Sequence, residues 1–194
     1  MNKVTFRREG ILTILCVVFL FSLGVHIVTR DNGTNVGSIY YGAVPGFNLQ
    51  HADETPFTLL DLRGETWVIN YVKNIQSSQS SIMADQINKF AQDWGINHEI
   101  KFLTITHETN IAAIQSFIEN NRPSEKRWEI ITGNANKITE LVQNGFHIPI
   151  KKDSEPNRFI LVDNNGQIRG YYTASDQSEL SRLSIDVNGL MRIS

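Results

Sequence analysis

The order of apolar segments between residues 67 and 106 constrains the fold more than any other feature of this chain. Residues 67–72 (WVINYV) form a short run rich in β-forming side chains, and residues 99–106 (EIKFLTIT) form a second. Between them, apolar residues recur at helical spacing from Ile82 to Trp94. A strand, a helix and a second strand in this order predict parallel strands joined by a right-handed crossover.

The segments that follow extend this pattern to the end of the chain. They are a helix over 111–118 with Asn110 as its N-cap, a strand over 128–132, a short helix over 138–142, a hairpin of 158–162 and 168–172, and a last helix starting near Asp176. The summed order predicts an α/β, thioredoxin-like fold, in which helices flank a central mixed sheet.

The N-terminus predicts a membrane anchor. Residues 11–28 contain no Asp, Glu, Lys or Arg and follow a basic tail, residues 1–10. As a helix this run would span roughly 27 Å, close to the thickness of a bilayer core. Basic residues before the span keep the N-terminus in the cytoplasm. We therefore expect a single-pass signal anchor, although the small residues at Ser22 and Gly24 leave a cleaved signal peptide open.

The remaining chain would then lie on the extracytoplasmic side, in a periplasm, at the cell exterior or in an intermembrane space. Residues 29–45 are rich in Gly and Asn and predict a linker, which leaves residues 46–194 as one folded domain. The net charge of −2 argues against a nucleic-acid partner. Cys16, the single cysteine, lies in the anchor, so the predicted domain has no thiol for a disulfide or a thiolate metal site.

Several segments resemble the Sco/SenC family of membrane-anchored copper chaperones. Leu62–Tyr71 (LRGETWVINY) is similar to the family's first core strand and its approach, and Trp128–Gly133 (WEIITG) to a later strand. Arg158–Tyr172 (RFILVDNNGQIRGYY) resembles the closing hairpin. The likeness runs from residue 46 to about residue 185, and it implies a thioredoxin-like fold and a role in respiratory-oxidase assembly.

The resemblance also implies a copper site, made by a Cys-x-x-x-Cys-Pro loop after the first core strand and a distant His. In this chain the two Cys positions hold Gln76 and Ser80, and the Pro position holds Ser81. The His position holds Glu155. Oxygen and amide donors match Cu(I) poorly, and serine cannot replace the thiolate that disulfide exchange requires.

We therefore expect a protein that is not an enzyme, binds no cofactor and holds no metal in the family manner. Its candidate partner is an oxidase subunit or a copper chaperone. The candidate partner-binding surface is the loop after the first core strand: Lys73, Asn74, Gln76, Ser77, Ser78, Gln79, Ser80 and Ser81.

Two alternatives stay open at this point. A rebuilt metal site could use Met83, His107 and Glu155 as ligands. A hydrolase could use Ser80 or Ser81, in the 77–81 loop, with His107 as its base, although no Gly-x-Ser-x-Gly motif is present. The simpler reading is that the serines cap a helix that starts near Ile82.

Overall fold

The computed structural model describes residues 40–94, 100–121, 127–151 and 154–192. Within them a seven-stranded sheet has the order β2-β1-β5-β4-β3-β6-β7. The strands are β1 (Asn48–His51), β2 (Pro56–Thr58), β3 (Thr66–Val72), β4 (Ile100–Thr106), β5 (Trp128–Thr132), β6 (Arg158–Val162) and β7 (Ile168–Thr173).

The sheet is mixed. Strands β3, β4 and β5 run parallel, whereas β6 pairs antiparallel with β3 and β7 antiparallel with β6. At the other edge, β1 pairs antiparallel with β5 and with β2. The parallel crossover and the closing hairpin predicted from the sequence are therefore confirmed.

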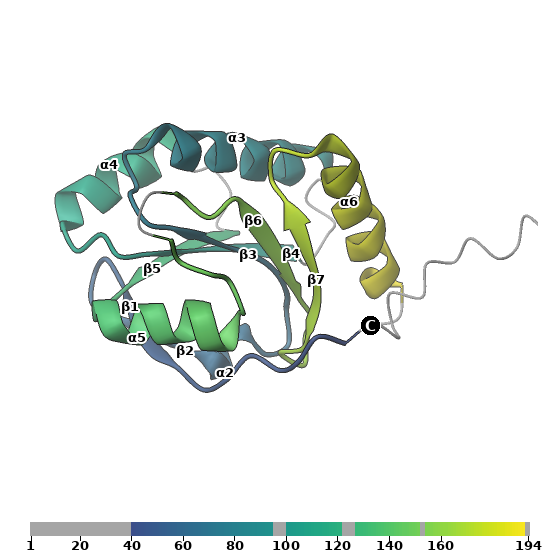
Figure 1. Ribbon diagram of the computed structural model, residues 1–194, viewed down its shortest axis with the longest axis horizontal. Coiled ribbons are helices and arrows are strands. Elements are labelled where there is room, and N and C mark those ends of the chain that lie inside the picture. Colours follow the sequence, from purple (N-terminus) through teal and green to yellow (C-terminus); the bar gives the residue numbers. More distant parts are fainter. Residues whose placement is uncertain (1–39, 95–99, 122–126, 152–153, 193–194) are drawn as a thin grey trace, which may run out of the picture. The chain divides into compact units, whose positions relative to one another are not determined.

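Helices cover both faces of the sheet. They are α2 (Leu59–Leu62), α3 (Ser78–Asp93), α4 (Ile111–Asn121), α5 (Ala135–Glu140), its π-helical continuation η1 (Leu141–Gly145) and α6 (Gln177–Met191). Figure 1 shows α3 and α4 along one side of the sheet and α5 along the other. Two buried clusters follow: one joins the sheet to α3, α4 and α6, and the other joins it to α2, α5 and η1.

The central strand β3 supplies both clusters because its side chains alternate between the two faces. Every residue of β3 is buried. Trp67, Ile69 and Tyr71 belong to the α5 side, and Val68 belongs to the α3 side. The α/β arrangement of a mixed sheet between helices is therefore the one that the sequence predicts.

Helix α3 begins earlier than the expected start near Ile82. It starts at Ser78, and the side chain of Ser77 caps it by accepting a hydrogen bond from the backbone N–H of Ser80. Apolar spacing did not reveal this first turn because its side chains are polar, so only the capping serine marks its beginning.

Part of the predicted linker packs on the domain. The backbone N–H of Tyr41 donates to Ile168 O (3.0 Å), and that of Val44 donates to Gly166 O (2.9 Å). Val44 is 3% exposed and belongs to the α5-side cluster. Residues 41–44 therefore pack against the β6–β7 hairpin, because a buried apolar side chain and sheet-like hydrogen bonds hold them there.

No helix among the described residues has the length and apolar character needed to cross a bilayer. The predicted basic tail at 1–10, the predicted anchor at 11–28 and the first part of the predicted linker lie outside the described residues.

Candidate functional site

Three chain segments meet at the carboxyl ends of the parallel strands. β3 ends at Val72 and leads into the loop before α3, and β4 ends at Thr106, just before His107. β6 runs in the opposite direction, so the segment that precedes it, residues 154–157, reaches the same edge. In open α/β sheets this edge is the usual place for a binding site.

Glu155 lies against the loop that follows β3. The backbone N–H of Lys73 donates to the Glu155 carboxylate (3.0 Å to Oε2). Two residues later, Asn157 Oδ1 accepts from Gln79 Nε2 at 3.0 Å. The structure thus brings the segment before β6 onto the β3–α3 loop, although the two are about 80 residues apart in the chain.

The Ser80 side chain links the β3–α3 loop to the first turn of α3. Its side chain is buried, and its hydroxyl lies 2.6 Å from the carbonyl oxygen of Ile75 and 2.8 Å from that of Ser77. A hydroxyl has one proton to share between these two acceptors. Ser80 therefore holds the first turn of α3 to the loop and is not exposed as a nucleophile.

The other loop residues present polar groups to solvent. Asn74, Gln76, Ser78 and Ser81 are exposed, while Lys73, Ser77 and Gln79 are half-buried. The backbone N–H of Gln76 donates to Asn74 Oδ1 at 2.9 Å, which fixes the turn before the helix. The result is a preformed polar surface around residues 73–81.

His107 packs on the opposite side of the sheet edge from α3. Its Nδ1 lies 3.3 Å from the Tyr71 hydroxyl, and its Nε2 lies 3.5 Å from Thr139 Oγ1 on α5. The rings of Tyr71 and His107 meet edge to face, with centroids 5.4 Å apart. With the imidazole proton on Nε2, Tyr71 donates to the ring and the ring donates to Thr139.

Burial sets the protonation states of His107 and Tyr71. Burial lowers the pKa of His107, and the nearby charge of Lys73 lowers it further. Burial, with a smaller contribution from the Glu155 carboxylate, raises the pKa of Tyr71 to about 12. A neutral imidazole and a neutral phenol are therefore the forms that occupy this edge at neutral pH.

Of the suggested donors Met83, His107 and Glu155, Met83 and His107 pack on opposite faces of the sheet. Met83 is 1% exposed in the α3-side core, where Asn70 Nδ2 lies 3.9 Å from its sulfur. His107 contacts Tyr71, which belongs to the α5-side core. Across the described ranges no group of three or more His, Cys, Asp or Glu side chains is arranged to hold a metal ion.

The suggested pairing of Ser80 with His107 is not assembled either. Both ring nitrogens of His107 face other partners, Tyr71 and Thr139, while the Ser80 hydroxyl faces backbone carbonyls. The contact with Thr139 was not predicted from the sequence, since it joins residues 32 positions apart. The alternation of β3, which places Tyr71 at the end of the Trp67–Ile69 face, is the signal that could have located Tyr71.

Comparison with solved structures finds Sco proteins. BsSco, described as a member of the Sco family of cytochrome c oxidase assembly proteins, aligns with a TM-score of 0.66 and 20% identity over 80% of this chain and 98% of its own. A SCO1/SenC family lipoprotein from Bacillus anthracis aligns with a TM-score of 0.65 and 19% identity, covering 77% of this chain and 95% of its own.

Yeast Sco1 with copper bound aligns with a TM-score of 0.59 and 14% identity, over 76% of this chain and 89% of its own. No protein-family model matches the sequence, and no curated protein matches it. The similarity thus confirms, at the level of the fold, the thioredoxin-like architecture and the Sco/SenC resemblance inferred from the sequence.

Proposed function

We propose that this protein is a membrane-anchored, non-catalytic Sco/SenC-like accessory factor that binds a protein partner through the β3–α3 loop. One observation carries the proposal. The three positions matched to the family's copper ligands hold Gln76, Ser80 and Glu155, and two of these side chains already bind loop backbone groups.

The donor set does not suit copper held in the family manner. The Ser80 hydroxyl and the Glu155 carboxylate are hard oxygen donors, and the Gln76 amide is a neutral one. Cu(I) prefers thiolates, yet the only cysteine of the chain is Cys16, in the predicted anchor. Without a thiolate at this loop, thiol–disulfide exchange has no nucleophile.

The exposed polar groups of the β3–α3 loop suit a protein-binding role. Asn74, Gln76, Ser78 and Ser81 expose amide and hydroxyl groups on a turn that is fixed by internal hydrogen bonds. A preformed surface loses little conformational entropy when it binds a partner. The fold is shared with cytochrome c oxidase assembly proteins, so we propose an oxidase subunit or a copper chaperone as the partner.

The anchor and its topology belong to the same proposal. The apolar run at residues 11–28 would hold the protein in the membrane, and the basic residues before it would place the domain on the extracytoplasmic side. Respiratory oxidases are membrane proteins, so a tether raises the effective concentration of the loop near such a partner.

The first experiment is affinity capture of the full-length protein from native membranes, with quantitative identification of co-purified proteins. Gln76→Arg should abolish capture of the specific partner, because it places a bulky charge on the loop. Gln92→Arg is the matched control, since Gln92 is an exposed glutamine near the far end of α3. Equal capture by the two variants would show that the loop is not the binding surface.

The second experiment tests copper directly. Full-length protein carrying Cys16→Ser is titrated with Cu(I) against a competing chelator, alongside a variant that adds Gln76→Cys, Ser80→Cys and Glu155→His. The added ligands should confer one-to-one Cu(I) binding that the parent lacks. One-to-one binding by the parent would overturn the proposal, and a failed gain would show that the three positions were matched wrongly.

A further inference from the structure

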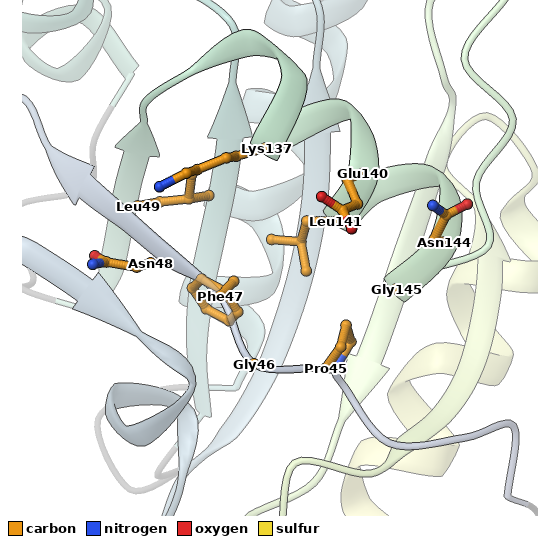
Figure 2. A pocket seen from close by; sticks show the side chains of 10 residues that line it. All are labelled: Pro45, Gly46, Phe47, Asn48, Leu49, Lys137, Glu140, Leu141, Asn144 and Gly145. Carbon is orange, nitrogen blue, oxygen red and sulfur yellow. The ribbon is translucent and has the colours of Figure 1, made fainter.

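A groove lies between the segment that enters β1 and the helical unit α5–η1. Its volume is about 560 Å³, which lies within the range of ligand-binding pockets. Figure 2 shows the segment Pro45–Leu49 forming one wall and α5–η1 the other. The lining residues are Pro45, Gly46, Phe47, Asn48, Leu49, Lys137, Glu140, Leu141, Asn144 and Gly145.

The middle of the groove is apolar. Leu49 and Leu141 are each 4% exposed, and Phe47 stands half-buried on the wall, stacked on Phe57 with ring centroids 6.2 Å apart. These side chains are anchored in the α5-side core, so the apolar surface is formed before any ligand arrives.

Polar side chains line the rim of the groove, and two of them, Lys137 and Glu140, carry opposite charges. Lys137 and Asn48 lie at one end and Asn144 lies at the other, with Glu140 between Lys137 and Asn144 (Figure 2). Lys137 and Glu140 are exposed, and within the part of the chain that the structure describes neither side chain has an ion-pair partner.

The wall formed by α5 and η1 has a fixed shape. η1 is a π-helical turn, in which the N–H of Phe146 donates to Leu141 O at 2.8 Å, and such turns often occur at functional sites. It brings Gly145 so close to Pro45 that a Cβ at residue 145 would lie 2.8 Å from the proline ring. On its other flank α5 is held by the buried Ile138.

We propose that this groove binds an extended peptide segment of a partner protein, with an apolar side chain between an acidic and a basic one. In an extended chain, alternate side chains point to opposite sides. The central apolar side chain would insert between Phe47 and Leu141. Its two neighbours would point to the rim, the acidic one toward Lys137 and the basic one toward Glu140. This inference does not depend on the function proposed for the β3–α3 loop.

Two features favour a peptide over a small molecule. The groove is open and runs along an extended stretch of backbone (Figure 2). Residues Pro45–Phe47 precede β1, so the main chain of these three residues takes no part in the pairing of β1 with its neighbours. The charged residues Lys137 and Glu140 also lie three residues apart on one helix. That spacing is similar to the reach of alternate side chains in an extended peptide, roughly 7 Å.

The test is fluorescence anisotropy with full-length protein in detergent micelles. The probes are fluorescein-labelled peptides with the core Glu-Leu-Lys and with the reversed core Lys-Leu-Glu, because the chain direction of the ligand is not fixed. One of them should bind saturably. Replacing its Leu by Ser should weaken binding by about tenfold or more, as expected for the loss of a buried leucine.

Charge reversal of the protein decides the orientation. Lys137→Glu and Glu140→Lys should each weaken the preferred peptide by roughly threefold or more. The double variant should bind the peptide of reversed order instead. Lys89→Glu is the matched control, since Lys89 is exposed on α3 at the other face of the sheet, and it should leave binding unchanged.

Three outcomes would overturn the inference. They are no saturable binding of either peptide, binding that is indifferent to Lys137→Glu, and displacement of the peptide by free leucine at the same concentration as by unlabelled peptide. The last would assign the groove to a small zwitterion. Gln76→Arg should leave peptide binding intact, so failure of the loop proposal and failure of this one are distinguishable.

Discussion

At the residue scale, the buried hydroxyl of Ser80 has a structural role. A side chain at the start of a helix that follows a central strand is well placed for chemistry, because backbone N–H groups and the helix dipole favour an anion there. Ser80 instead turns its hydroxyl inward, 2.6 Å from Ile75 O and 2.8 Å from Ser77 O. The Ser80 side chain therefore stabilises the loop before α3.

Removing this hydroxyl should destabilise the domain. Ser80→Ala leaves the buried carbonyl of Ile75 without its donor, so we expect a loss of about 1–2 kcal/mol in the free energy of unfolding. Ser81→Ala is the matched control, since Ser81 is exposed on the same turn, and its effect should lie within about 0.5 kcal/mol. Urea unfolding followed by circular dichroism measures both, and equal effects would contradict the structural role of Ser80.

His107 predicts a pH dependence of stability. Burial first, and then Lys73, lower its pKa below the ordinary value of 6.5. The unfolded chain thus binds a proton more readily than the folded one, so stability is highest above pH 6.5 and is lost as the pH falls toward the lowered pKa. With the imidazole proton on Nε2, protonation of Nδ1 also removes the acceptor that faces the Tyr71 hydroxyl.

His107→Gln should therefore flatten the fall in unfolding temperature between pH 7.5 and pH 5. His147→Gln serves as the control because His147 is exposed, and it should retain the wild-type profile. Unfolding temperatures at several pH values provide the measurement. A wild-type slope in His107→Gln would show that another group carries the dependence.

At the element scale, helix faces explain which contacts hold the domain together. α6 places Leu180, Leu183, Val187 and Leu190 against the sheet, at the spacing of one helical face. Its N-cap Asp176 accepts hydrogen bonds from the N–H groups of Ser178 and Glu179. The Glu179 carboxylate pairs with Arg182.

Two leucine-sized substitutions on α6 separate the buried face from the exposed one. Leu183 is fully buried, and Leu183→Ala should cost about 2–5 kcal/mol through lost burial and the cavity left behind. Ile185, two residues on, is 51% exposed, and Ile185→Ala should change stability by about 0.5 kcal/mol or less. Chemical denaturation compares the two, and similar losses would contradict the face assignment.

The five strands from β3 to β7 could be predicted from the sequence more accurately than the helix ends, whereas the short strands β1 and β2 at one end of the sheet were not predicted from apolar spacing. The predicted strand at 128–132 matches β5, and the hairpin signal around Asn165-Gly166 lies between β6 and β7, because period and turn chemistry are local. The start of α3 and the π-helical end of α5 were not predicted. Both depend on hydrogen bonds, which the spacing of apolar residues in the sequence does not reveal.

The candidate site was predictable only in part, for a similar reason. Resemblance in sequence identified Gln76, Ser80 and Glu155 as the positions to inspect, and the loop they border is polar in the structure. The group formed by Tyr71, His107 and Thr139 depends on how β3, β4 and α5 come together. A pattern along one chain does not encode such contacts between distant segments.

At the scale of the whole molecule, the sheet couples two cores that face away from each other. Successive residues of β3 enter opposite clusters, as do Phe159 and Ile160 of β6. A buried polar chain adds to the sheet: Trp128 Nε1 donates to Thr104 Oγ1 at 2.9 Å, and that hydroxyl donates to Asn70 Oδ1 at 2.8 Å. These bonds join β5, β4 and β3 within the α3-side core.

This coupling predicts a single cooperative unfolding transition. The three tryptophans report on both sides, since Trp67 belongs to the α5-side core and Trp94 and Trp128 belong to the α3-side core. In Trp67→Phe the fluorescence reports only the α3 side, and in the double variant Trp94→Phe and Trp128→Phe it reports only the α5 side. Each midpoint is compared with the circular dichroism midpoint of the same variant, so that any loss of stability cancels.

Coincident midpoints are expected because neither core can lose its strands while the other keeps them. A fluorescence midpoint that precedes the circular dichroism midpoint in one variant alone would show that this side opens first. In that case the two helical layers would be separate units of stability, and the sheet would not transmit the loss of one core to the other.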